Sequence, residues 1–265
     1  MKTRQTTLVL LELILLLCSM LAATLGMSAI YYAALLLLPL LVLWKNRTEG
    51  EAVSLLCVPK KERWHTMLPL LPWILLLTVL TALLSSLAMR AFGIEPSPIP
   101  ETPLPTALLR HALLPAVLEE LFFRYLPLLT LGRERPRTLV LISALFFALA
   151  HLSLYQLPYA LVAGALYMTV ALYTESVLPC MLLHFCNNAL SVLMMLHGEQ
   201  TLFVVLLPVI STLLLGVSLF FLIKKRRLYR ESISALFSKD ERIMLEKSTI
   251  FYCILTILLT ILSIF

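Results

Sequence analysis

Long apolar segments, separated by short stretches rich in charged and turn-forming residues, follow one another along the whole chain. A helix that crosses the hydrocarbon core of a bilayer needs about 20 mostly apolar residues. The segments that approach or exceed this length are 8–44, 67–89, 107–131, 139–155, 158–173, 177–196, 202–223 and 250–265. The first would form a helix of about 55 Å, too long for one crossing, so we expect it to divide near residues 26–28. The pattern predicts an all-α fold, a polytopic transmembrane helix bundle of about eight or nine spans.

Composition narrows the class of protein. Hydrophobic residues make up 60% of the 265 and charged residues 14%, whereas soluble proteins carry roughly 25% charged residues. No soluble fold of this length can bury so much apolar surface, because small proteins leave much of their area exposed. These values exclude a soluble globular domain, a disordered chain and a nucleic-acid-binding module. The five cysteines lack paired spacing, so neither a disulfide framework nor a CxxC metal site is indicated.

Basic residues gather between alternate spans. Of the 21 Lys and Arg residues, two, five, three and eight lie in segments 2–4, 45–66, 132–138 and 224–249 respectively. All of these segments share one face if the spans simply alternate. Lys and Arg in short loops mark the cytoplasmic side, so we expect a cytoplasmic amino terminus. With nine spans, the carboxyl terminus lies outside.

Two stretches between the spans have a character of their own. Five prolines between residues 96 and 105 predict a stiff loop after the third span. Segment 228–247 mixes apolar side chains with charged ones. It fits a helix lying along the cytoplasmic interface and, equally well, a solvated helix within the loop.

Segment 107–131 carries three charges near its middle, Glu119, Glu120 and Arg124. Each costs roughly 2.5–3.5 kcal/mol at the bilayer centre, so they need compensation. Glu120 and Arg124 are spaced i, i+4 and share a helix face, which predicts an ion pair. The Glu119 side chain is rotated about 100° around the helix axis from that of Glu120, so it needs another partner. Pro115 predicts a kink in the same helix. The pair could simply fix helix packing, but that interpretation leaves Glu119 unexplained. Outside this segment, the charge within a span that remains without a predicted partner is Glu12.

Three further polar side chains lie in later spans. His151 follows the apolar run of segment 139–155, and His184 and Asn188 are spaced i, i+4 in segment 177–196. Each has a plain structural interpretation as a packing residue or a polar contact between helices. Counted from the predicted cytoplasmic ends, however, Glu119, His151 and Asn188 lie about 16–18 Å deep at 1.5 Å per residue. This common depth predicts one polar cavity that opens toward the cytoplasm.

The residue types in this cavity indicate hydrolysis. A carboxylate beside a neutral imidazole is a plausible general base for water, and a second histidine with an amide can donate hydrogen bonds to an oxyanion. Neither a GxSxG elbow nor an HExxH motif is present. Two histidines and a glutamate can also ligate a divalent metal such as zinc. The residues themselves leave both the metal-dependent and the carboxylate-only versions open.

Three motifs occur in order within these hydrophobic segments: EExxxR (Glu119, Glu120, Arg124), FxxxH (Phe147, His151) and HxxxN (His184, Asn188). Together they resemble the CPBP intramembrane protease family, which comprises type II CAAX prenyl endopeptidases and bacteriocin-processing or immunity-type Abi membrane proteins. The resemblance implies that Glu119 and His151 activate water and that His184 and Asn188 stabilise the oxyanion. Glu120 and Arg124 would support the site. If a metal is bound, Glu119, His151 and His184 are its candidate ligands.

The resemblance covers about residues 107–193, which divides the chain into amino-terminal spans (1–106), a catalytic core (107–193) and carboxyl-terminal spans (194–265). We expect an intramembrane endopeptidase in a bacterial plasma membrane that hydrolyses a peptide bond of a membrane-associated peptide or protein. Its partners are then that substrate and the lipid bilayer, with no nucleic acid. Two alternatives stay open: a non-enzymatic bacteriocin immunity or membrane scaffold protein, and a small transporter with a Glu–His proton relay.

Overall fold

The computed structural model describes residues 2–45, 54–93, 102–197, 201–237 and 242–262. Over this part of the chain every regular element is a helix, which confirms the all-α prediction. The elements are α1 (Lys2–Leu25), α2 (Ser28–Lys45), α4 (Lys61–Met67), η1 (Leu68–Leu70), α5 (Leu71–Ala91), α6 (Leu104–Leu108), η2 (Leu109–Leu113), α7 (Leu114–Glu120), η3 (Leu121–Tyr125), α8 (Leu126–Leu131), α9 (Pro136–Ala150), α10 (Leu157–Thr174), α11 (Leu178–His197), α12 (Thr201–Lys224), α13 (Arg226–Leu236) and α14 (Lys247–Leu262).

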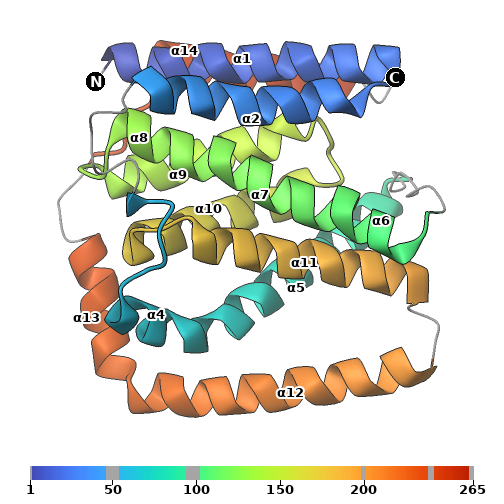
Figure 1. Ribbon diagram of the computed structural model, residues 1–265, viewed down its shortest axis with the longest axis vertical. Coiled ribbons are helices and arrows are strands. Elements are labelled where there is room, and N and C mark those ends of the chain that lie inside the picture. The colour runs from blue at the N-terminus through green and yellow to red at the C-terminus, as the bar shows by residue number, and fades with distance from the viewer. Residues whose placement is uncertain (1, 46–53, 94–101, 198–200, 238–241, 263–265) are drawn as a thin grey trace.

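Most of the helices lie side by side in layers (Figure 1). Helices α1, α2 and α14 form one outer layer, and α2 packs on α7 and η3. The middle of the bundle holds α7 to α11, with the closest packing between α9 and α10. Helix α12 forms the opposite edge against α5, and α13 runs across the helix ends. The elements that carry the candidate site residues therefore lie in the middle layers.

Several helices have the length and composition of membrane spans. Among the described residues, five stretches are long and apolar enough to cross a bilayer, and three shorter apolar helices accompany them. The five are Arg4–Leu25, Ser28–Lys45, Lys61–Ala91, Leu157–Thr174 and Leu178–Leu196, and the shorter ones are Pro136–Ala150, Val209–Lys224 and Lys247–Leu262. The chain is an integral membrane protein by this criterion, while the count of eight or nine spans stays a prediction.

The first apolar stretch divides where the sequence predicts. Helix α1 ends at Leu25, and Gly26 has φ +66°, a conformation that glycine adopts without steric cost. The Met27 amide then donates to the Ala22 carbonyl at 2.9 Å, which satisfies a carbonyl group of the last turn. Helix α2 begins at Ser28 and returns antiparallel to α1 (Figure 1).

The stretch from α6 to α8 is a continuous helical run that contains two π-helical turns, η2 and η3. Each π turn comes directly before the start of a helix whose second residue is proline, Pro115 in α7 and Pro127 in α8. Proline has no N–H to donate and its ring crowds the carbonyl of residue i−4, so the helix loosens to a wider turn. The irregularity predicted at Pro115 thus takes the form of π turns on both sides of α7.

Helix α9 is shorter than the predicted span 139–155, because it ends at Ala150. The His151 ring nitrogen Nδ1 lies 2.7 Å from the Phe147 carbonyl and satisfies one of the carbonyl groups left free at the helix end. Leu152 then has φ +46°, which no α-helix accommodates. The prediction that residues 151–155 continue the helix was wrong, and His151 lies at its carboxyl end instead.

The basic segments meet at one end of the bundle. Arg63 and Arg133 both pair with Glu175, at 2.8 and 3.2 Å. Arg137 donates to the Phe237 carbonyl at 3.0 Å, which joins the segment after α13 to the same region. These contacts agree with the prediction that segments 45–66, 132–138 and 224–249 share a face, and the assignment of that face to the cytoplasm remains a prediction.

Parts of the predicted loops lie outside the described residues, namely 46–53, most of the proline-rich loop (94–101) and 238–241. The end of the predicted loop 45–66 is helical, since α4 begins at Lys61. Most of α13 falls within the amphipathic segment 228–247, and Tyr229 is its buried residue. Whether α13 lies along a membrane interface or in water stays an open prediction.

Glu12, which has no partner predicted from sequence, lies between α1 and α14. It is buried, and the Tyr252 hydroxyl donates to its Oε2 at 3.4 Å. Near the amino-terminal end of α1, the buried Gln5 side chain donates to the Met244 carbonyl at 3.0 Å and accepts from the Glu246 amide at 2.9 Å. These polar contacts attach the last helix of the chain to the first.

Candidate active site

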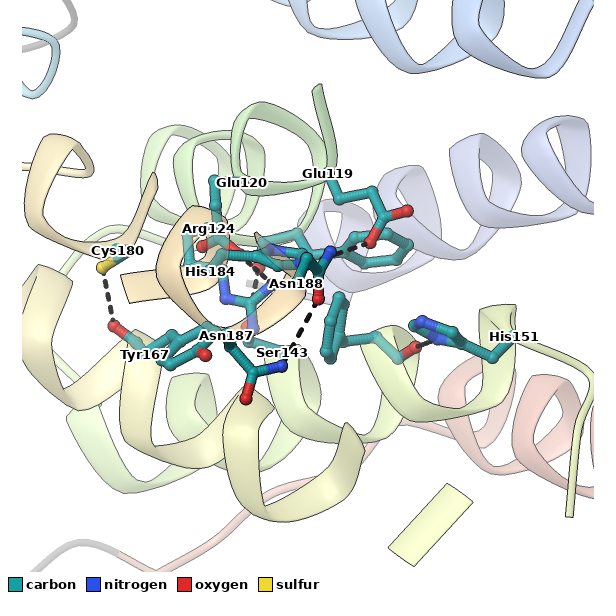
Figure 2. Close-up of polar contacts among 12 residues, drawn as sticks. Glu119, Glu120, Arg124, Ser143, His151, Tyr167, Cys180, His184, Asn187 and Asn188 are labelled. Atoms are coloured by element: carbon teal, nitrogen blue, oxygen red, sulfur yellow. Dashed lines mark hydrogen bonds and ion pairs between the residues drawn. The ribbon is translucent and has the colours of Figure 1, made fainter. Parts of the chain in front are cut away.

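The polar residues predicted to share a cavity come from three places in the middle layers. Glu119 and Glu120 end α7, with Arg124 following in the π turn η3. His151 follows α9, and α11 supplies His184 with two asparagines. Figure 2 shows these side chains gathered around His184, with His151 set to one side.

Glu120 is the centre of a buried ionic network. Its Oε1 atom lies 3.1 Å from Arg124 Nη1 and 2.8 Å from His184 Nδ1. The side chains of Glu120 and Arg124 are 0% exposed, so bulk water cannot solvate either charge. The i, i+4 pair expected from sequence is therefore present, and it reaches a second helix through the histidine.

The Arg124 guanidinium is held between aromatic rings. Its Cζ atom lies 4.2 Å from the Phe147 ring centroid and 5.4 Å from that of Tyr167. Among the described residues, its Nε and Nη2 groups have no hydrogen-bond partner. A guanidinium facing aromatic rings gains cation–π attraction where water is excluded. Phe147 and Tyr167 thus help to keep a charge inside an apolar layer.

His184 has a different carboxylate on each side. Nδ1 contacts Glu120 at 2.8 Å, and Nε2 lies 3.9 Å from Glu119 Oε2. Glu120 is paired with a guanidinium and accepts hydrogen bonds, so the network places a proton on Nδ1. This leaves Nε2 as the nitrogen that faces Glu119. Glu119 is 8% exposed, and the partner that it needs is thus this histidine on another helix.

His151 is oriented by its own helix. A carbonyl oxygen only accepts hydrogen bonds, so the 2.7 Å contact with Phe147 O places the proton on Nδ1. In the neutral ring, Nε2 is then the basic nitrogen. The Phe147 ring lies against both histidines, with centroid distances of 4.9 Å to His151 and 5.7 Å to His184. No ion pair joins His151 to Glu119 among the described residues.

The asparagines continue the network to a residue that sequence reasoning missed. Thr78 Oγ1 in α5 lies 3.2 Å from Asn187 Oδ1, and Asn187 Nδ2 donates to Asn188 Oδ1 at 3.3 Å. With its oxygen occupied, Asn188 has its amide Nδ2 hydrogens available to another acceptor. Thr78 is 0% exposed. Nothing in the sequence separates it from the other threonines in apolar segments.

The structure therefore joins Glu119, Glu120, Arg124 and His184 directly. His151 borders this group through the Phe147 ring, and Asn188, one turn after His184 in α11, bonds Asn187. Within the described residues, no three His, Cys, Asp or Glu side chains come together closely enough to hold a metal ion. The set of Glu119, His151 and His184 considered from sequence does not form a three-ligand site in this arrangement.

One of the comparisons with known proteins finds a match. Residues 101–190 match the family model for type II CAAX prenyl endopeptidase Rce1-like proteins. No curated protein and no solved structure matches the chain. The matched region contains every residue of the network except Thr78. Over residues 101–190 the chain is therefore similar to the Rce1-like type II CAAX prenyl endopeptidases.

Proposed function

We propose that the protein is an intramembrane endopeptidase that hydrolyses a peptide bond of a membrane-associated peptide or protein substrate. The family match supports a CAAX-type intramembrane protease at the level of the family. The observation that carries the proposal is the position of Glu119 opposite His184 Nε2, inside a buried network that also contains a compensating guanidinium. Packing alone gives no reason for a carboxylate there.

Glu119 and His151 are the residues that we assign to water activation. Glu119 provides a carboxylate, and His151 presents Nε2, the ring nitrogen that the Phe147 carbonyl does not engage. A water molecule held by these groups loses a proton to the carboxylate as its oxygen attacks the scissile carbonyl carbon. The same proton then passes to the leaving amine as the C–N bond breaks.

His184 and Asn188 are assigned to the oxyanion. Two carboxylates and one guanidinium leave the buried network with one net negative charge, and an imidazolium at His184 makes it neutral. In this doubly protonated form His184 donates from Nε2, and Asn188 donates from Nδ2, to the developing negative charge. Glu120 and Arg124 hold His184 in place.

Purified protein in proteoliposomes, incubated with membrane-associated peptides that include prenylated CAAX sequences, tests the proposal by mass spectrometry of the products. We expect Glu119→Gln to slow cleavage by about 10²–10⁴-fold, the usual contribution of a general base. Glu231→Gln is the matched control, because Glu231 is an exposed residue of α13. Equal cleavage by the two variants would refute the role of Glu119. A wild-type protein that cleaves none of the peptides, and whose cellular function survives Glu119→Gln, would indicate a non-enzymatic protein.

A further inference from the structure

An apolar cavity lies outside the buried ionic network, between η1, α5, α11 and α12. Its volume is about 610 Å³, within the usual range of small-molecule sites. Leucine, valine, proline and phenylalanine side chains line most of it. In a chain of this kind the cavity lies at membrane depth, where lipid chains are the abundant apolar molecules.

Helix α12 forms the outer wall of this cavity and packs mainly on α5, η1 and α13 (Figure 1). Its buried Ser218 donates a hydrogen bond to the Pro69 carbonyl, which fixes the wall at one point. The lining runs along α12 from Ser211 to Phe221, about 15 Å at 1.5 Å per residue, and Lys225 lies just beyond the end of this helix. One leaflet of the hydrocarbon core is about 15 Å thick, so the cavity is long enough to accept an acyl chain of one leaflet.

One end of the cavity carries positive charge. Lys225 and His65 line this end, next to the basic segment that begins α13. Lys225 is half-buried and has no ion-pair partner among the described residues. An anionic head group is the complement of an unpaired lysine at the mouth of an apolar slot.

We propose that this cavity binds an anionic phospholipid. One acyl chain lies between α5, α11 and α12, and the phosphate contacts Lys225 and His65. The cavity wall includes Leu75 and Val79, on either side of Thr78, and Leu183 and Cys186 on the helix of His184. The lipid therefore packs against the reverse side of the two helices that the Thr78–Asn187 contact joins. An effect on cleavage rests on the proposed function, whereas binding itself does not.

Photolabelling of the full chain in phosphatidylcholine nanodiscs tests the site. A trace of phosphatidylglycerol with a diazirine on one acyl chain is photolysed, and the labelled peptides are mapped by mass spectrometry. We expect labels on cavity-lining residues of α5, α11 and α12, competed by unlabelled phosphatidylglycerol and not by phosphatidylcholine. Equal competition by phosphatidylcholine would overturn the requirement for an anionic head group, and labels spread evenly over all helices would overturn the site.

Two matched pairs of variants locate the lipid. Leu215→Trp fills the cavity, and its control Leu213→Trp alters a residue of α12 that is 65% exposed and outside the lining. Lys225→Gln removes the cation at the mouth, and Lys224→Gln removes its exposed neighbour, which stacks on Phe220. We expect Leu215→Trp to abolish cavity labelling and Lys225→Gln to weaken it about fivefold. Both controls should label like the wild type.

The lipid test does not depend on proteolysis. The Glu119→Gln variant should be labelled like the wild type, because Glu119 lies outside the cavity. Added phosphatidylglycerol should also raise the melting temperature of the wild type in detergent, because a ligand that binds the folded state stabilises it. The rise in melting temperature should be smaller for Lys225→Gln. Indistinguishable labelling of Leu215→Trp and Leu213→Trp would overturn the proposal. The proposal would also be overturned if a prenylated peptide displaced the photolabelled lipid at a lower concentration than unlabelled phosphatidylglycerol does. That result would make the cavity a substrate site.

Discussion

Replacing Arg124 with methionine would leave the Glu120 carboxylate in an apolar layer with His184 as its remaining partner. The methionine side chain is unbranched and apolar, so it can still fill the space between Phe147 and Tyr167. The substitution therefore removes the charge and its cation–π contacts with little change in packing. The loss of stability then measures the cost of leaving the Glu120 carboxylate without its guanidinium partner in an apolar layer.

The magnitude follows from the burial of both partners. Glu120 and Arg124 are 0% exposed and 3.1 Å apart, and breaking a buried pair by removing one partner costs about 3–5 kcal/mol. At about 2–4 °C per kcal/mol for a chain approaching this size, Arg124→Met should lower the melting temperature by about 6–20 °C. Arg227→Met is the control, because Arg227 pairs with Glu231 at the same i, i+4 spacing while 91% exposed. Exposed pairs contribute little, so this variant should melt close to the wild type.

A double-mutant cycle separates the ion pair from packing. Glu120→Gln removes the orphaned charge, so the double variant Glu120→Gln, Arg124→Met should be more stable than Arg124→Met alone. The coupling expected for contacting residues is about 0.5–3 kcal/mol. Melting is followed by scanning fluorimetry in one detergent and checked against denaturant unfolding. Additive effects of the two substitutions, or a melting temperature of Arg124→Met within 1 °C of that of Arg227→Met, would refute the reasoning.

Two further substitutions test how helices position the site. A Cβ atom at Gly164 would lie 2.8 Å from a backbone atom of α9, so Gly164→Ala should lower the free energy of unfolding by about 1–3 kcal/mol and reduce cleavage. The control is Gly216→Ala, which should be neutral or slightly stabilising because Gly216 has open space around it. Equal melting temperatures of the two glycine variants would contradict this. Thr78→Val removes the contact with Asn187 and should lower kcat about two- to tenfold, the effect of one hydrogen bond. The Thr81 hydroxyl contacts carbonyl groups of its own helix, so Thr81→Val should leave kcat unchanged. An equal loss of kcat in the Thr78 and Thr81 variants would show that Thr78 does not position Asn187.

Helix geometry explains which parts of the network could be predicted from sequence. The Glu120–Arg124 pair lies within one helical run, where i, i+4 side chains share a face whatever surrounds them. The contact between Glu120 and His184 joins residues 64 apart, and it depends on how α7 packs against α11. Spacing can place both residues in helices at similar depth, but it cannot choose the rotation that brings them together.

The end of α9 shows where hydropathy misleads. The apolar residues around position 152 continue the hydrophobic pattern, so the sequence predicts helix as far as residue 155. The helix stops instead at Ala150, where the His151 side chain satisfies the Phe147 carbonyl. Hydropathy measures the average polarity of a window and contains nothing about one side-chain hydrogen bond. The same contact orients the His151 ring, so the side chain that ends the helix also has its Nε2 atom held in one direction.

A comparison of Glu12 with Glu119 and Glu120 shows why an acidic residue in an apolar helix does not by itself mark an active site. Glu12 contacts a neutral phenol, Tyr252, and a protonated carboxyl group is enough to satisfy that environment. Glu120 contacts a guanidinium, which is always charged, and Glu119 faces a histidine, a side chain that can take or release a proton. Both carboxyl groups of the candidate site thus have charged or titratable neighbours, which Glu12 does not have in Tyr252. What distinguishes the candidate site is therefore the set of opposite and titratable charges around its carboxylates, and that set is assembled by packing the α7–η3 run against α11.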